Sequence, residues 1–102
     1  MEAKASLFNI GQLVITPGAL QVLSEQELIP LVLLSRHIRG DWAEMEPEDQ
    51  EANRQALTDG SRIFTRYTLA DGVVLVRIWI ITEAKGEDES RASTCILLPS
   101  EY

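Results

Sequence analysis

Apolar positions recur with a helical spacing in the first half of the chain and with the two-residue period of strands after Gly60. Three prolines each predict the start of a helix, because the first helical position tolerates a missing N–H; they are Pro17, Pro30 and Pro47. Thr16 is the expected N-cap of the first, short helix. The second helix is predicted to run to residue 38 or 39 and to stop at Gly40, and the third to close at Asp59–Gly60.

The second half of the chain predicts three strands, at residues 61–69, 73–82 and 92–98, with a turn at 70–72 and a polar segment at 85–90. Residues 11–15 predict a fourth, short strand. Chain-adjacent strands with short turns favour an antiparallel meander. We therefore expect an α+β fold in which N-terminal helices pack on one face of a small antiparallel sheet. One domain spans residues 1–102, and residues 1–10 are expected to be flexible.

Alternation within the strands gives the predicted sheet two different faces. In the middle strand one set of side chains is aliphatic and should meet the helices: Val74, Val76, Ile78 and Ile80. In the first strand the odd positions share one face: Ile63, Thr65, Tyr67 and Leu69. The opposite face mixes arginine with aromatic and apolar residues: Arg62, Phe64, Arg66, Arg77, Trp79 and Ile81.

Composition and charge narrow the function classes. The 102 residues are 45% apolar and 25% charged, which is typical of one globular domain, and 9 basic against 16 acidic residues leave a net charge of −7. Because phosphate neutralisation needs clustered lysine and arginine, we expect no direct nucleic-acid binding. The apolar stretches are too short to cross a membrane, no signal-peptide pattern is present, and a lone Cys95 excludes an intramolecular disulfide and predicts a small core residue. The expected compartment is the cytoplasm.

Two sets of residues are candidates for chemistry. His37, the only histidine, ends the second predicted helix. Either it helps to close the helix, with Asp41 as a local cap and Trp42 packed under the helix, or it acts as a general acid or base oriented by Asp41. An arginine row would either clamp a phosphate or a carboxylate, or lie on a solvated face: Arg62, Arg66 and Arg77. One histidine and no EF-hand or zinc spacing predict no metal site and no cofactor.

Acidic residues form the third candidate site. Residues 41–51 hold six carboxylates and no base, and a second acidic block lies at 87–89. These charges either serve solubility and the start of a helix or present a surface that mimics a nucleic-acid backbone to a basic partner. For the second case the predicted contacts are Asp41, Glu44, Glu48, Asp49, Glu87 and Asp88, with Trp42 as an aromatic anchor.

Four segments of the chain resemble a family of small plasmid- and phage-borne proteins: His37–Trp42, Asp59–Ile63, Ile78–Ala84 and the closing Leu97–Tyr102. The resemblance covers nearly the whole chain from Gly11, and some members carry restriction-subunit labels. This chain departs from the family in its longer acidic segment before Arg91. The resemblance implies a mobile-element setting, which favours proteins that disarm host defence.

Two functional hypotheses follow. The first is a non-enzymatic inhibitor, of the anti-CRISPR or anti-restriction type, that binds the basic surface of a host nucleic-acid-handling complex. The alternative is a metal-independent ribonuclease, similar in architecture alone to barnase and RelE-type toxins, with His37 as general acid or base. In it Arg62, Arg66 or Arg77 would stabilise the phosphorane, and Thr82 or Thr94 would hold the substrate. A homodimer formed through the face with Phe64, Trp79 and Ile81 is compatible with both.

Overall fold

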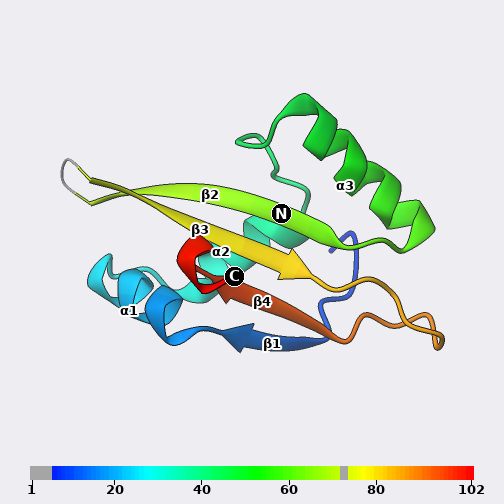
Figure 1. Ribbon diagram of the computed structural model, residues 1–102, viewed down its shortest axis with the longest axis horizontal. Helices are drawn as coiled ribbons and strands as arrows, with labels where there is room; N and C mark the ends of the chain where they lie inside the picture. The colour runs from blue at the N-terminus through cyan, green and yellow to red at the C-terminus, as the bar shows by residue number, and fades with distance from the viewer. Residues whose placement is uncertain (1–5, 72–73) are drawn as a thin grey trace, which may run out of the picture.

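Helices occupy the first part of the chain and most strands the second. A computed structural model of the chain describes residues 6–71 and 74–102. The elements in these residues are β1 (Gln12–Ile15), α1 (Pro17–Glu25), α2 (Pro30–Ile38), α3 (Pro47–Asp59), β2 (Ile63–Asp71), β3 (Val74–Thr82), β4 (Ser93–Leu97) and the 3₁₀ turn η1 (Pro99–Glu101) (Figure 1). The predicted α+β class is confirmed. Residue 72 of the predicted turn 70–72 and residue 73 of the predicted strand 73–82 lie outside the described residues.

The sheet is mixed, which corrects the expectation of an antiparallel sheet. Its strand order is β1-β4-β3-β2, with β2–β3 and β3–β4 antiparallel as the predicted meander requires. The short fourth strand is present, but β1 runs parallel to β4. Parallel neighbours need a long connection, and here all three helices and two strands separate the pair. The sequence pattern of a four-residue strand says nothing about the direction of such a distant partner.

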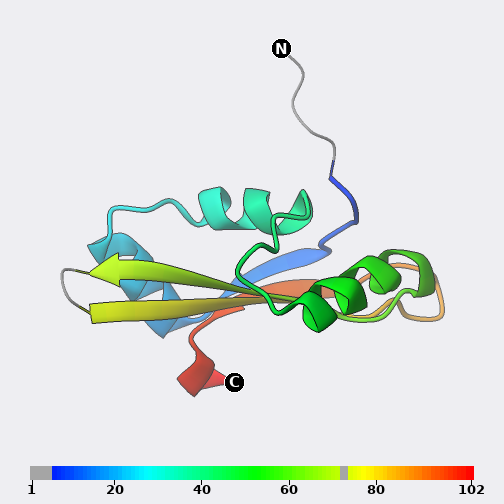
Figure 2. The ribbon, with the colours of Figure 1, turned by 90° about the horizontal axis from the view of Figure 1, so that it is seen from above.

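Helix α2 covers one face of the sheet, and η1 lies against the other (Figure 2). The main core lies between the sheet and the helices: Ala19, Leu23, Leu33, Tyr67, Ile78, Ile80 and Ile96. The predicted division of strand residues between two faces is therefore confirmed at these positions. Val74, expected to meet the helices, is instead 58% exposed because the β2–β3 hairpin extends beyond the end of β4.

Helix α3 borders the sheet at the outer edge of β2 and does not lie on its face (Figure 1). A second core joins them: Trp42, Met45, Ala56 and Ile63. The Asn53 amide pairs with the backbone of Phe64 in β2, donating to its carbonyl at 2.8 Å and accepting from its N–H at 3.2 Å. This side chain satisfies the two backbone groups that an edge strand would leave unpaired at this point.

The predicted helix ends are confirmed. Thr16 Oγ1 accepts from the Ala19 N–H at 3.3 Å, which is the expected N-cap of α1. At the end of α2, Gly40 adopts φ +84°, and its N–H donates to the His37 carbonyl while the Asp41 N–H donates to that of Arg36. These two bonds satisfy the last carbonyls of α2 and reverse the chain into the segment that leads to α3.

The expected flexibility of residues 1–10 stays a prediction, and the expectation for Cys95 is corrected. Of the segment 1–10 that was expected to be flexible, residues 1–5 lie outside the described residues, whereas residues 6–10 are tied to the fold. The Leu7 N–H donates to the Ile38 carbonyl at 2.8 Å, and the Ile10 carbonyl accepts from Thr94. Cys95 is only half-buried, because its register opposite Ile81 places it on the face away from the helices.

Replacing Asn53 with alanine should lower the free energy of unfolding by about 1–3 kcal/mol, because two backbone groups of Phe64 lose their partners. Urea unfolding followed by circular dichroism measures the change. The matched control is Gln55→Ala, an exposed amide on the same helix. Equal stability of the two variants would contradict a role for Asn53 in holding α3 to the sheet edge.

Candidate functional site

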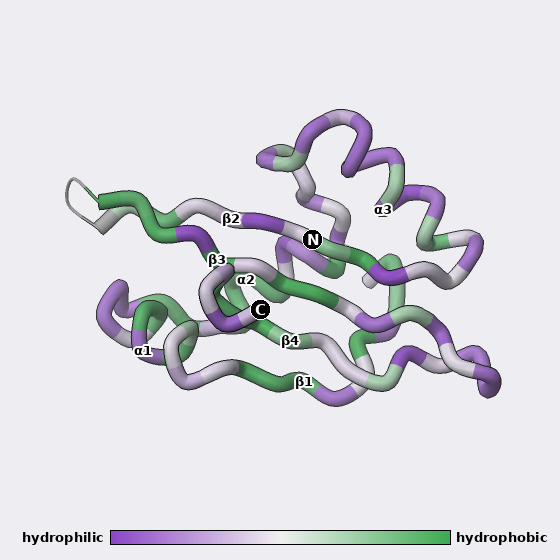
Figure 3. Tube along the Cα trace, viewed as in Figure 1, coloured by the Kyte–Doolittle hydropathy of each residue, from purple (hydrophilic) through white to green (hydrophobic). Residues whose placement is uncertain are grey.

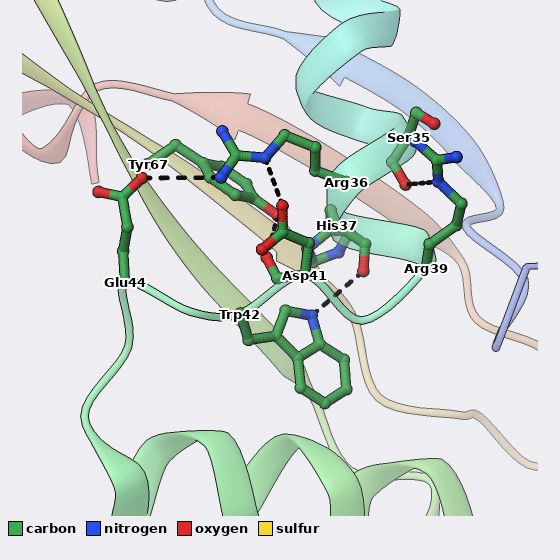
Figure 4. A network of polar contacts seen from close by, with 8 residues as sticks. All are labelled: Ser35, Arg36, His37, Arg39, Asp41, Trp42, Glu44 and Tyr67. Carbon is green, nitrogen blue, oxygen red and sulfur yellow. Dashed lines mark hydrogen bonds and ion pairs between the residues drawn. The ribbon is translucent and has the colours of Figure 1, made fainter.

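Trp42, the predicted aromatic anchor, belongs to the core. Its side chain is 4% exposed, and its indole N–H donates to the His37 carbonyl at 3.2 Å (Figure 4). It packs with Met45, Ala56 and Ile63 in the second core. Of the two interpretations of Trp42, packing under the second helix is confirmed and an exposed anchor is wrong, because the turn at Gly40 directs the chain back under α2.

Arg36 neutralises part of the predicted acidic surface. Its Nε donates to Asp41 Oδ2 at 2.7 Å, and an Nη lies 4.0 Å from the Glu44 carboxylate (Figure 4). The hydrogen bond from Arg36 lowers the pKa of Asp41. The guanidinium also lies 4.5 Å above the ring of Tyr67, whose hydroxyl donates to the Asp41 carbonyl. Asp41 therefore holds Arg36 and not, as the catalytic interpretation required, the imidazole of His37.

His37 is 0% exposed and lies between α2 and the helix-covered face of the sheet. Its Nδ1 is 2.7 Å from the hydroxyl of Thr65 in β2, and its Nε2 is 2.8 Å from that of Thr82 in β3. The Thr82 hydroxyl is in turn 2.7 Å from that of Thr94 in β4. Thr94 donates to the carbonyl of Ile10 at 2.8 Å. One chain of hydrogen bonds thus joins α2, three strands and the segment before β1.

The direction of every hydrogen bond in this chain follows from its last member. A carbonyl only accepts, so the Thr94 hydroxyl donates its one proton to the Ile10 carbonyl. Thr94 must therefore accept from the Thr82 hydroxyl. Thr82 then has no proton left for His37 and accepts from the imidazole Nε2–H. Burial keeps the ring neutral, so Nδ1 is the unprotonated nitrogen and accepts from the Thr65 hydroxyl. His37 is neutral, with its proton on Nε2, and every polar atom of its ring has a partner.

Burial keeps the imidazole in that neutral state. Removal from water lowers the pKa of His37 from 6.5 to about 3. A second proton would have to sit on Nδ1, which would then face the Thr65 oxygen as a donor and displace its hydroxyl proton. The site is built to exclude charge, which is the opposite of what a general acid or base at neutral pH needs.

The three candidate arginines lie on the other face of the sheet from His37. Arg66 is directly opposite Trp79 in the β2–β3 register, and Arg77 is opposite Thr68. Arg62 donates to the Tyr102 hydroxyl at 3.0 Å and borders a cavity shared with Phe64 and Trp79. The structure does not bring the histidine and the arginines into one cleft, and the convergence on which the ribonuclease alternative depended is not present.

The remaining acidic candidates lie near the two ends of α3. Glu48 and Asp49 are exposed on its first turn, whereas Glu87 and Asp88 are exposed in the loop of residues 85–90. The Lys85 N–H donates to the Gly60 carbonyl, which places this loop beside the last turn of α3. Figure 3 shows hydrophilic colouring along much of α3 and at this loop. Within residues 6–71 and 74–102, no three histidine, cysteine or carboxylate side chains gather as a metal site.

Arg91 and Tyr102 were not among the candidate functional residues of the sequence analysis. Arg91 is 4% exposed, and its guanidinium donates to the carbonyls of Ser61, Glu83 and Ala56 at 2.7–3.0 Å. These acceptors are main-chain groups of α3, of the residues just after it and of the residue that follows β3, so no side-chain pattern in the sequence could have indicated them. Tyr102 packs edge-on against Trp79, with ring centres 5.7 Å apart.

Comparisons with known proteins found no relative: no family model, no curated protein and no solved structure matches the chain. None of the helices in the described residues has the length and apolar character needed to cross a membrane.

Replacing Thr82 with valine should lower the free energy of unfolding by about 1–3 kcal/mol, because the His37 Nε2–H loses its acceptor while remaining buried. Thr68→Val is the matched control: this half-buried β2 threonine forms no side-chain hydrogen bond with the described residues. Urea unfolding of both variants measures the difference. Equal effects would show that the chain of hydrogen bonds does not contribute.

The stability of the protein should fall as the pH is lowered from about 6.5 towards 4.5. In this range the unfolded chain protonates His37, whose pKa there is 6.5, while the folded state, with a pKa of about 3, does not. The unfolded state therefore binds more protons, and stability rises with pH by up to about 1.4 kcal/mol per unit. Carboxylates with lowered pKa, such as Asp41 and Glu101, act in the same direction below about pH 4.5.

This pH dependence has a direct spectroscopic check, because the chain contains a single histidine. The imidazole carbon and nitrogen NMR signals of the folded protein should stay those of the neutral Nε2–H tautomer down to pH 4.5. A midpoint near 6.5 in the folded protein would refute the buried hydrogen-bond chain.

Proposed function

We propose that this chain is a small non-enzymatic interaction protein that binds a basic surface of a partner through α3. The observation that supports this is the position and charge of that helix. Residues 46–59 contain five carboxylates and a single base, Arg54, and the helix stands at the edge of the sheet with its polar side in solvent. Glu48 and Asp49 form no ion pair with any residue that the structure describes.

The contact surface is narrower than the acidic sequence suggests. Asp41 and Glu44 face Arg36, and Glu51 is bound by Arg54 at 2.8 Å, so their charge is partly compensated. The groups available to a partner are the first turn of α3, with Glu48 and Asp49, and the loop with Glu87 and Asp88. Such a surface accelerates encounter with a basic partner and makes the binding sensitive to salt.

The partner class that we propose is a host complex that handles nucleic acid and is inhibited when its basic groove is occupied. The mobile-element resemblance favours an anti-CRISPR or anti-restriction role, which would be exercised in the cytoplasm. The ribonuclease alternative has less support, because a general acid or base must reach the substrate and His37 has no exposed surface. Thr82 and Thr94, the residues expected to hold that substrate, are equally buried.

The test measures whether expression of the chain protects an infecting phage from a defence system of the host cell. Phage plating should rise when the chain is expressed in hosts with a defined CRISPR or restriction system. Reversal of Glu48 and Asp49 to lysine should reduce that protection at least tenfold. It should also weaken co-purification with the defence complex, most strongly below 0.15 M salt, where the charges are least screened.

A matched control separates this surface from net charge. Glu25→Lys with Glu27→Lys introduces the same change of charge at exposed positions at the end of α1. The control variant should protect as the unaltered chain does. Loss of protection in both variants would show an effect of net charge alone, and absence of protection against every defence system would refute the proposal.

A further inference from the structure

The face of the sheet that the helices leave open combines aromatic rings with arginines. Figure 2 shows α2 on one side of the sheet and η1 on the other. On this open side Phe64 packs edge-on against Trp79 at 5.1 Å between ring centres, and Trp79 against Tyr102 at 5.7 Å. A hollow of about 240 Å³ lies among these rings, lined also by Arg62 and Ile81.

Arginines surround this cluster, although the protein as a whole is acidic. Arg62 lies at one end, with its guanidinium 5.9 Å from the centre of the Tyr102 ring, and Arg77 is exposed at the other. Arg66 lies between them, opposite Trp79, with one Nη bound to the Glu44 carbonyl. None of the three forms an ion pair with a carboxylate of the described residues.

Two carboxylates near this side, Glu101 and Glu83, form no ion pair with the arginines of the described residues. Glu101 is occupied: its carboxylate accepts from Thr16 Oγ1 and from the Gly18 N–H. Glu83 follows β3 at the position across from Arg62 but forms no ion pair with it, since Arg62 bonds to Tyr102. The cationic groups therefore keep donors available for an external anion.

One further group on this face lacks a partner. The indole N–H of Trp79 is buried and has no acceptor among the residues of the described chain. A buried donor without an acceptor is costly, so a ligand that shifts the Tyr102 ring and offers an oxygen or nitrogen would relieve it. Tyr102 itself is 71% exposed and is held here by Arg62.

From this juxtaposition we propose that the open sheet face binds single-stranded nucleic acid, with bases against Trp79, Phe64 and Tyr102 and backbone phosphates on Arg62, Arg66 and Arg77. Aromatic side chains on a sheet are suited to unpaired bases, whose flat faces are exposed, and guanidinium groups bind phosphate oxygens. The net charge of −7 indicated no such partner, but net charge averages over surfaces that the fold separates. The site is independent of α3 and of the proposed function.

The experiment is an NMR titration of the ¹⁵N-labelled chain with eight-nucleotide single-stranded DNA and RNA at 50 mM salt. The chain has two tryptophans. The indole N–H signal of Trp79 should shift on binding, while that of Trp42, buried and bonded to His37, should stay in place as an internal reference. An unchanged Trp79 signal at millimolar oligonucleotide would overturn the proposal.

Variants assign the binding energy to its groups. Arg77→Ala and Arg62→Ala should each reduce affinity at least fivefold. Each should also reduce the slope of log affinity against log salt concentration by about the amount that one phosphate contact contributes. Tyr102→Ala, at an exposed position, should cost between about 5-fold and 150-fold if the ring stacks on a base. The matched control is Arg54→Ala on α3, which should leave the affinity unchanged because Arg54 lies away from this face and pairs with Glu51.

Two other occupants of the face would each overturn the proposal. Polyglutamate of equal charge that binds as tightly as the oligonucleotides would show that the face recognises charge and not bases. A dimer in sedimentation equilibrium, with concentration-dependent shifts of Trp79 and no response to oligonucleotide, would show that a second copy of the chain covers it. Failure here leaves the phage-protection result unaffected, because that result depends on Glu48 and Asp49.

Discussion

The insertion of a neutral imidazole between α2 and three strands is the constraint on which the rest of the structure depends. His37 reaches Thr65 and Thr82 at 2.7 and 2.8 Å, and Thr82 passes the connection to Thr94. Each hydrogen bond has one possible direction, so this network permits no alternative pairing. A helix shifted along the sheet would leave buried polar groups without partners. This network fixes α2 on one face, and the turn at Gly40 then fixes where the acidic segment begins.

Covering one face of the sheet leaves the other open, and this asymmetry separates the charges. Carboxylates gather along α3 and in the loop beside its end, whereas Arg62 and Arg77 lie on the open face with the aromatic residues. A protein of net charge −7 thereby presents surfaces of opposite character. The two binding sites proposed for this protein lie on different surfaces, so they are compatible and can be tested independently.

Much of the fold was predictable because it depends on local chemistry. Prolines at the first helical position, Thr16 as a cap and Gly40 and Gly60 as stops marked the helices, and alternation marked the strands and their faces. The candidate site was less predictable. For Trp42 both an exposed anchor and a ring packed under the helix were open, and it lies in the core. A tryptophan beside acidic residues has the same local sequence pattern in either position. The roles of Asn53 and Arg91 were not predictable at all, because both bind main-chain groups of distant segments.

The sequence by itself determined the element types, the two-faced sheet and the net negative charge, since each follows from neighbours along the chain or from a count of residues. Only the tertiary structure decided that β1 joins β4 in parallel, that His37 is buried away from the arginines, and which carboxylates remain uncompensated. These outcomes depend on residues far apart in sequence, such as Thr94 and Ile10, which meet because the core closes around them. Long-range contact is set by the packing of the whole core, and no local pattern encodes it.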